Sequence, residues 1–330
     1  MRKISIYVFI LIASFIFASE ASALTLSPIR FEISGNPGET IHKEITLINE
    51  TNKTETYSAS YSNFEAQGES GEPAFVAPKD GLGTWIKTGV GSVVVPAKQQ
   101  KIVPFTITIP KDAEPGGHFA VIFWGTPTGP SSGVSIGAKT GILVLLSVNG
   151  DVETNAGLLN FNTVGKQFWY STLPVNFEYR FRNDGGDRIK PQGKIVIHNS
   201  IFFPTEYLDA NLVSGNILPG STRKFKVDWI NYERPDDYVA PEGFFGKFWS
   251  DVSYQWKNFA VGFYTARLNV TYGGENERAR DSVFFFVFPW QLVLVMIIVG
   301  GAGGYGGRKL LKRYNKYIIK KARLGMQHEA

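Results

Sequence analysis

Cysteine is absent from this chain of 330 residues, and histidine occurs only four times. The lack of cysteine excludes disulfides, a thiol nucleophile and cysteine-ligated zinc. The histidines are far apart, and none has the spacing of a metal-ligand pair. Neither a glycine-rich phosphate loop nor a serine nucleophile elbow occurs. We therefore expect a protein that is not an enzyme and has no catalytic residue, no metal site and no cofactor.

Charge is absent from Ser282 to Gly307, and this stretch is almost wholly apolar from Phe284 to Val299. About 20 apolar residues suffice to cross a bilayer as a helix, so the sequence predicts a single transmembrane helix at 284–307. The tail at 308–330 follows with eight basic residues and one acidic residue. Lys and Arg beside a membrane span mark its cytoplasmic side, which predicts a cytoplasmic C-terminus.

The other end of the chain, residues 1–23, has the pattern of a signal peptide. Arg2 and Lys3 precede an apolar run, and the small residues Ala21-Ser22-Ala23 form a cleavage site. The region from Leu24 to Asp281 is therefore predicted to be external, tied to the cell membrane by a single pass. The lipid bilayer is the first partner that the sequence predicts.

The overall charge of +5 comes from the basic tail, because the predicted external region has more acidic than basic residues. A nucleic-acid-binding protein needs a basic face on its folded part. We expect no nucleic-acid partner.

The external region has the pattern of β-strands. From Ile102 to Ile109 every second side chain is apolar, so one face of the strand should be buried. Short runs of this kind, separated by Gly, Pro and Asn, favour β-sandwiches. We predict an all-β fold with two tandem immunoglobulin-like sandwiches, at 24–150 and 151–283. Long polar loops are expected at 62–83 and 125–137.

One segment, 240–260, departs from the strand pattern. Within it, residues 243–259 place large apolar side chains at helical spacing, opposite a polar face. The segment precedes the last hairpin of the domain, so it should lie near the membrane. Its aromatic face could belong to the domain core, to the bilayer interface or to a protein partner. The membrane-interface candidates are Phe245, Phe248, Trp249, Trp256 and Trp290.

Two further features remain open on sequence alone. Trp85 and Trp124 flank the two predicted loops and could stack on a sugar ligand or could be ordinary core residues. The spacing Gly300-x-x-x-Gly304 permits close helix packing and weak self-association, although a flexible helix end would have the same composition.

The first domain resembles the N-terminal domain of WxL-interacting cell-surface proteins. The resemblance rests on four stretches: Leu26-Ser27-Pro28-Ile29-Arg30, Pro37-Gly38-Glu39, Ile45 to Asn49, and Val95-Pro96-Ala97 through Val103 to Pro110 and on to Pro115-Gly116-Gly117-His118-Phe119. Proteins of that family also have a signal peptide, two immunoglobulin-like domains, a C-terminal membrane helix and a basic tail. The resemblance implies contact with peptidoglycan through the first domain and with a surface protein through the second.

Two functions are therefore carried forward. The first is a membrane-anchored cell-envelope binding or adhesion protein that contacts peptidoglycan or a surface protein through its immunoglobulin-like domains. The second is an accessory subunit of a membrane or secretion complex, or a chaperone-like scaffold, which binds its partner through the membrane helix and the aromatic segment.

Overall fold

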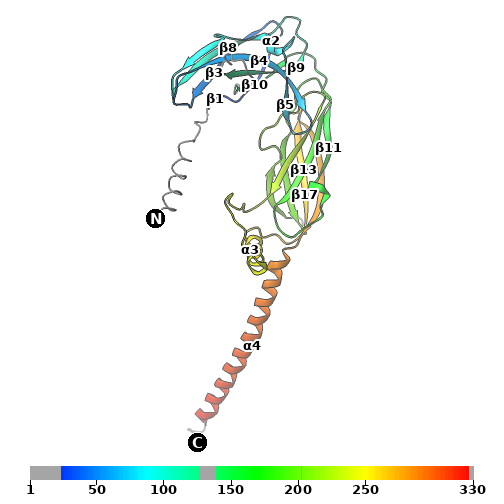
Figure 1. Cartoon of the computed structure of the whole chain (residues 1–330). Coiled ribbons are helices and arrows are strands. Elements are labelled where there is room, and N and C mark those ends of the chain that lie inside the picture. The colour runs from blue at the N-terminus through cyan, green and yellow to red at the C-terminus, as the bar shows by residue number, and fades with distance from the viewer. Residues whose placement is uncertain (1–23, 127–138, 202, 327–330) are drawn as a thin grey trace, which may run out of the picture. The chain divides into compact units, whose positions relative to one another are not determined.

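The computed structural model describes residues 24–126, 139–201 and 203–326, with side chains as far as residue 319. The predicted signal peptide and most of the predicted loop at 125–137 lie outside these residues. The fold is all-β with one long C-terminal helix (Figure 1), which confirms the predicted fold class. The chain divides into two compact units. Unit 1 comprises residues up to Gly157 together with two later segments, Phe181–Lys190 and Asn216–Arg223; unit 2 comprises the rest.

Unit 1 is a sandwich of two sheets. One sheet has the strand order β1-β3-β8-β6, and the other has the order β2-β10-β9-β4-β5, with β7 also pairing with β4. The pairing of β2 with β10 is parallel. The strands are β1 (Leu24–Ser27), β2 (Arg30–Gly35), β3 (Thr40–Asn49), β4 (Glu55–Gln67), β5 (Glu72–Val76), β6 (Ile86–Thr88), β7 (Ser92–Val95), β8 (Gln100–Thr108), β9 (Gly116–Gly125) and β10 (Lys139–Val148).

The alternation read from the sequence places the core of unit 1 correctly. Val103, Phe105 and Ile107 of β8 and the following Ile109 are all essentially inaccessible to solvent. The predicted loop at 62–83 is wrong, because β4 continues to Gln67 and pairs with β5 as a hairpin. Phe64 and Phe75 face each other across this hairpin with ring centroids 6.5 Å apart, and such aromatic cross-strand pairs stabilise a sheet.

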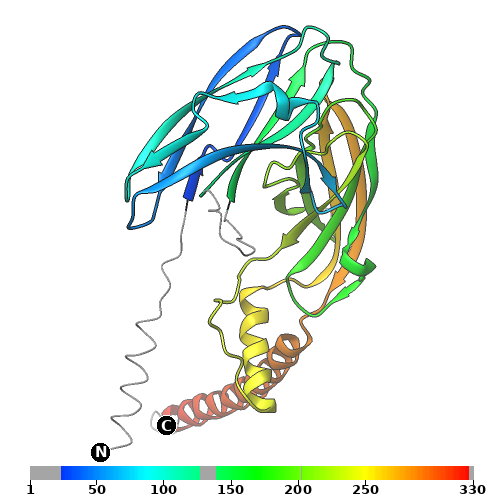
Figure 2. The same cartoon turned by 45° about the horizontal axis from the view of Figure 1, so that its top comes forward.

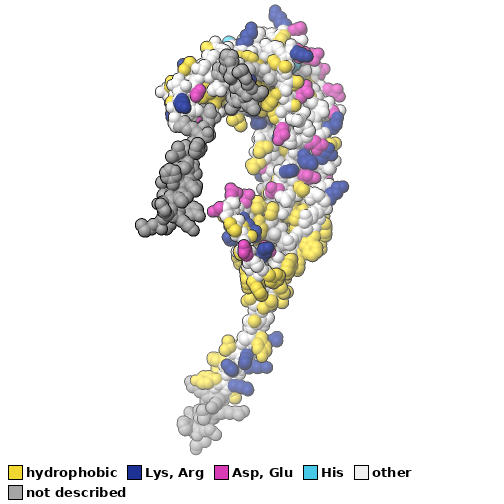
Figure 3. Space-filling view, in the orientation of Figure 1, with side chains coloured by type: hydrophobic (Ala, Val, Ile, Leu, Met, Phe, Trp, Pro, Cys, Tyr) yellow, Lys and Arg dark blue, Asp and Glu magenta, His cyan; other side chains and the backbone are white. Residues whose placement is uncertain are grey.

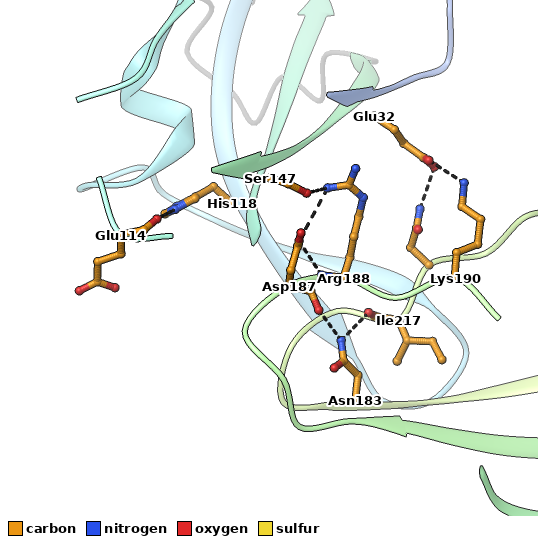
Figure 4. A network of polar contacts seen from close by, with 10 residues as sticks. Glu32, Glu114, His118, Ser147, Asn183, Asp187, Arg188, Lys190 and Ile217 are labelled. Atoms are coloured by element: carbon orange, nitrogen blue, oxygen red, sulfur yellow. Dashed lines mark hydrogen bonds and ion pairs between the residues drawn. The ribbon is translucent and has the colours of Figure 1, made fainter. Parts of the chain in front are cut away.

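The two later segments of unit 1 are held by polar contacts (Figure 4). Lys190 Nζ lies 2.6 Å from Glu32 Oε2, and Asn216 Nδ2 donates to Glu32 Oε1 at 2.9 Å. Arg188 donates to Ser147 Oγ at 2.6 Å. Partial burial would raise the pKa of Glu32, but the hydrogen bonds from Lys190 and Asn216, with the charges of Arg30 and Lys190, outweigh burial and leave this pKa lowered.

Unit 2 contains the second pair of sheets, with strand orders β11-β13-β16 and β12-β18-β17-β14-β15. Its core is aromatic: Phe177 of β13 packs edge-on against Phe285 of β18, with centroids 5.5 Å apart. The strands are β11 (Ala156–Thr163), β12 (Trp169–Tyr170), β13 (Val175–Asn183), β14 (Gln192–Asn199), β15 (Pro204–Asp209), β16 (Ser221–Trp229), β17 (Gly262–Tyr272) and β18 (Glu277–Val287).

Among the described residues, unit 2 has two α-helices, one between β16 and β17 and the other after β18. Besides the short α2 (Leu82–Trp85) of unit 1 and a 3-10 turn η1 (Val164–Lys166), the described residues form α3 (Phe244–Lys257) and α4 (Trp290–Met326). The prediction of a helix within 243–259 is confirmed. The predicted start of the membrane helix at Phe284 is wrong: Phe284–Val287 pair with β17 as part of β18, and α4 begins after Pro289.

Helix α4 is long and apolar enough to cross a membrane, as judged by its length and composition from Trp290 to Ile319. Its charge-free part, Trp290 to Gly307, would rise about 27 Å at 1.5 Å per residue, close to the thickness of a bilayer's hydrocarbon core. The glycines between Gly300 and Gly307 do not interrupt the helix, and the space around them is open. Self-association through them stays a prediction.

Candidate membrane-interface site

The aromatic side chains of α3 point into solvent. Phe245 is 76% exposed, Trp249 is 56% exposed and Trp256 is 65% exposed. Phe248 is half-buried, and its ring lies edge-on to that of Trp290 with centroids 6.4 Å apart. The interpretation of these rings as the core of the sandwich is therefore wrong. The structure brings Phe248 against Trp290, and Trp249 and Trp256 beside the first turns of α4, whereas Phe245 packs on Phe244.

Helix α3 lies beside the first turns of α4 (Figure 2). Of its side chains, those of Val252 and Gln255 are buried. Gln255 Oε1 accepts a hydrogen bond from the backbone N–H of Leu292 at 2.9 Å, and its amide nitrogen donates to Gln291. The first N–H groups of a helix have no partner within that helix, so Gln255 satisfies one of them from a neighbouring helix.

An open apolar groove of about 640 Å³ lies between α3 and α4. It runs beside the charge-free part of α4 and contains no charged side chain. Its lining residues are Trp249, Val252, Ser253, Trp256, Leu292, Val295, Met296, Val299 and Gly300.

The loop that leads from β16 to α3 is fixed by buried polar contacts. Asn258, only 1% exposed, accepts hydrogen bonds from the amides of Asn231 and Tyr232 and donates to the Tyr232 carbonyl. The Arg234 guanidinium lies 4.6 Å and 4.2 Å from the ring centroids of Tyr238 and Tyr254, which is the geometry of a cation–π contact. Helix α3 is thus anchored at its C-terminal end as well as along α4.

The apolar surface of α3 is accompanied by a second set of rings on the neighbouring sheet. Phe263 and Phe284 are stacked with centroids 5.5 Å apart, and Phe168 lies 5.9 Å from Phe284. In Figure 3 hydrophobic side chains gather over α3, the start of α4 and the adjacent strand ends. We call the second set of rings, those on the sheet, the aromatic band. Its members are Phe168, Trp169, Phe263, Phe284 and Phe286. Sequence reasoning assigned Phe284 and Phe286 to the membrane helix and overlooked the other members.

The two ligand-loop candidates in unit 1 differ in their surroundings. Trp124 is completely buried in the core and offers no ring face to a ligand, so it is a core residue. Trp85 is half-buried at the end of α2, where its ring packs on His118 with centroids 4.7 Å apart. Sugar stacking at Trp85 stays a prediction.

No protein-family model matches this chain, and no curated protein matches it. The chain is similar to the solved class 5 fimbriae chaperone CfaA, with a TM-score of 0.37 and 11% identity over 81% of this chain and 100% of that chain. It is similar to the E. coli chaperone DraB, with a TM-score of 0.31 and 10% identity over 79% of this chain and 98% of that chain. For the Pseudomonas aeruginosa CupB2 chaperone the values are 0.32 and 7%, over 78% and 98%. These similarities assign no role to any residue of this chain.

Proposed function

We propose that this protein is a membrane-anchored, non-catalytic binding protein of the cell envelope, in which α3 and the start of α4 form one membrane-contacting site. The observation that carries the proposal is that a helix with exposed Phe and Trp rings is locked by Gln255 to the first turn of a candidate membrane span. Trp and Tyr favour the bilayer interface, and an amphipathic helix can lie in it.

The energetics favour insertion of these rings. Burying a large apolar side chain is worth about 1.5–3 kcal/mol, and the rings of Phe245, Trp249 and Trp256 are each more than half exposed. Together they would contribute several kcal/mol when transferred to an interface, and α4 already holds α3 at the right place. The basic tail after Gly307 supports a cytoplasmic C-terminus with both units outside.

The structure favours the accessory-subunit or scaffold hypothesis over peptidoglycan binding. The buried Trp124 is lost as a sugar-stacking residue, whereas the groove between α3 and α4 gives a membrane partner an apolar surface. The partner is therefore proposed to be a protein of the same membrane. Binding of peptidoglycan or a surface protein, as the family resemblance implies, stays a prediction for unit 1.

This proposal is tested by measuring how deep α3 lies in the membrane. Because the chain has no cysteine, a spin label attaches only at the cysteine that is introduced. A spin label is attached to the full chain at Trp249→Cys in lipid nanodiscs, with Lys226→Cys on β16 as the control site, because Lys226 is an exposed residue of the other sheet. We expect the label at 249 to be more accessible to oxygen than to a water-soluble nickel complex, and the label at 226 to show the reverse. Equal accessibility of both labels to the nickel complex would refute the membrane-interface assignment.

A further inference from the structure

The outer face of the five-stranded sheet of unit 2 carries two adjacent depressions. They lie farther along the strands from α4 than the aromatic band does. One, of about 620 Å³, is lined by Arg267 and Arg280 among others, and the other, of about 470 Å³, by Lys194 and Arg278. Val196 and Asn269 line both depressions, so the two form one continuous surface. We call this surface the basic face.

The strand register explains why these cations gather. Lys194, Asn269 and Arg280 are direct cross-strand neighbours on β14, β17 and β18, so they form one row. Arg267 lies two residues along β17 from this row, and Arg278 lies two residues along β18 on its other side. Because side chains two apart on a strand share a face and are roughly 7 Å apart, the rows follow one another at that interval.

The cations of the basic face have one acidic cross-strand neighbour, Asp209 opposite Lys194, whose carboxylate accepts a hydrogen bond from the Asn211 amide. Among the described residues, Lys194, Arg267, Arg278 and Arg280 form no ion pair with a carboxylate, and the contacts they make are to uncharged groups. Arg280 Nε donates to Asn269 Oδ1 at 3.4 Å, and Lys194 lies over the Tyr207 ring. The one acidic residue lining the depressions, Asp281, accepts a hydrogen bond from the Phe161 amide.

The basic face could bind either lipid headgroups or an anion outside the membrane. Its distance from α4 decides between these two. Arg280 precedes Val287, the end of β18, by seven residues, which is roughly 24 Å along a strand. Even a strand tilted by 45° would keep Arg280 about 17 Å from that end. The headgroup layer extends roughly 5–8 Å from the hydrocarbon core, and charges are screened within about 8 Å. The central row therefore lies beyond the reach of lipid headgroups.

We propose that the basic face binds an extended phosphate-bearing polymer outside the membrane. Arg forms bidentate hydrogen bonds to phosphate oxygens, and Gln192, Asn269 and Thr271 add uncharged donors beside the cations. An acidic polypeptide fits this surface less well, because peptides recognised through their backbone bind at sheet edges, and the backbone groups of a sheet interior are already paired.

The test uses the full chain in nanodiscs of zwitterionic lipid, with fluorescent inorganic polyphosphate as the probe and anisotropy as the readout. We expect binding at 50 mM salt that weakens at 200 mM salt. The double variant Arg267→Gln/Arg280→Gln should bind at least about tenfold more weakly, since it loses two charge-assisted contacts to phosphate. The matched control is Lys224→Gln/Lys226→Gln on β16, which removes the same charge from the other sheet and should retain the affinity of the unchanged chain.

Three results in nanodiscs of zwitterionic lipid would overturn the proposal. The first is no binding of polyphosphate at 50 mM salt, and the second is an equal loss in both double variants. The third is tighter binding of polyglutamate than of polyphosphate, which would indicate an acidic protein partner. In nanodiscs that contain phosphatidylserine the affinity should change equally for all three chains; loss of binding by the unchanged chain and the control variant, which both keep the basic face, would mean that lipid occupies the face. Circular dichroism and thermal unfolding confirm that each variant is folded.

Discussion

Gly116 shows how one residue fixes the attachment of a distant segment in unit 1. Its φ of +118° is a conformation that side chains rarely adopt, and an added Cβ would lie 2.4 Å from the carbonyl oxygen of Gly186. The neighbouring Gly117 donates its amide to that oxygen at 3.0 Å. No local sequence pattern marks this contact, because the close approach of Gly186 depends on residues some 70 positions away.

Gly116→Ala should destabilise the protein by about 2 kcal/mol or more, through backbone strain and the clash with Gly186. Urea unfolding measures the loss of stability, and hydrogen exchange of residues 181–190 measures how firmly this segment is attached. Gly157→Ala is the control, because nothing lies within 4 Å of its Cβ position. A Gly116→Ala protein as stable as the control would contradict the role assigned to this glycine.

The lowered pKa of Glu32 makes the attachment of the 181–190 segment sensitive to acid, because Glu32 contacts Lys190. A carboxyl group with a depressed pKa stabilises the fold above its unfolded-state pKa, and this stability is lost as pH falls through the lower folded-state value. Glu32→Gln should therefore destabilise the contact with Lys190 at neutral pH by roughly 1–2 kcal/mol. As the pH falls through the lowered pKa of Glu32 and its carboxylate becomes protonated, the difference between the two proteins should shrink. Unfolding midpoints from pH 7 to pH 2.5 test this, and a difference that does not change with pH would contradict it.

At the scale of elements, the contact between α3 and α4 depends on Gln255. Gln255→Ala removes the partner of the Leu292 amide and leaves Gln291 without its donor. An unsatisfied buried polar group costs about 1–3 kcal/mol, so α3 should separate from α4 more readily. Spin labels placed on α3 and α4 of the full chain should show a broader distance distribution in this variant than with the exposed Ser253→Ala. Unchanged distances would mean that the apolar contacts alone hold α3.

The elements that could be read from the sequence are those with a strong local pattern. Strand β8 alternates apolar and polar residues along its length, and α3 repeats large apolar residues at helical spacing, so both were predicted. The short strands β6 and β12 were missed because three or two residues carry no period. The role of Gln255 was missed for another reason: its partner is a backbone amide of a distant helix, and no residue pattern marks such a contact.

At the scale of the whole chain, unit 1 depends on segments that the predicted boundary at residue 150 leaves out. A fragment of residues 24–150 retains its buried core but lacks Phe181–Lys190 and Asn216–Arg223. We expect it to fold with a cooperative transition and a β-type circular dichroism spectrum, at a lower unfolding midpoint than unit 1 in the full chain. A spectrum of disordered chain would show that the two later segments are essential for folding.

The proposed orientation of the chain in the membrane rests on its basic tail. Protease added to intact cells stripped of their wall should digest both units and spare a tag placed after residue 330. Lysed cells are the control, in which the tag should also be lost. Digestion of the tag in intact cells would reverse the assigned topology.

The direct passage from β18 to α4 has a mechanical consequence. Only Phe288 and Pro289 separate the strand from the helix, so no flexible linker can absorb tension. A pull on α4 would load β18 along its own axis, against a ladder to β17 that runs from Gly262 opposite Val287 to Tyr272 opposite Glu277. The hydrogen bonds of that ladder would be strained together in shear and not opened one after another. In the proposed topology, the hairpin would therefore carry a mechanical load between the external units and the membrane helix.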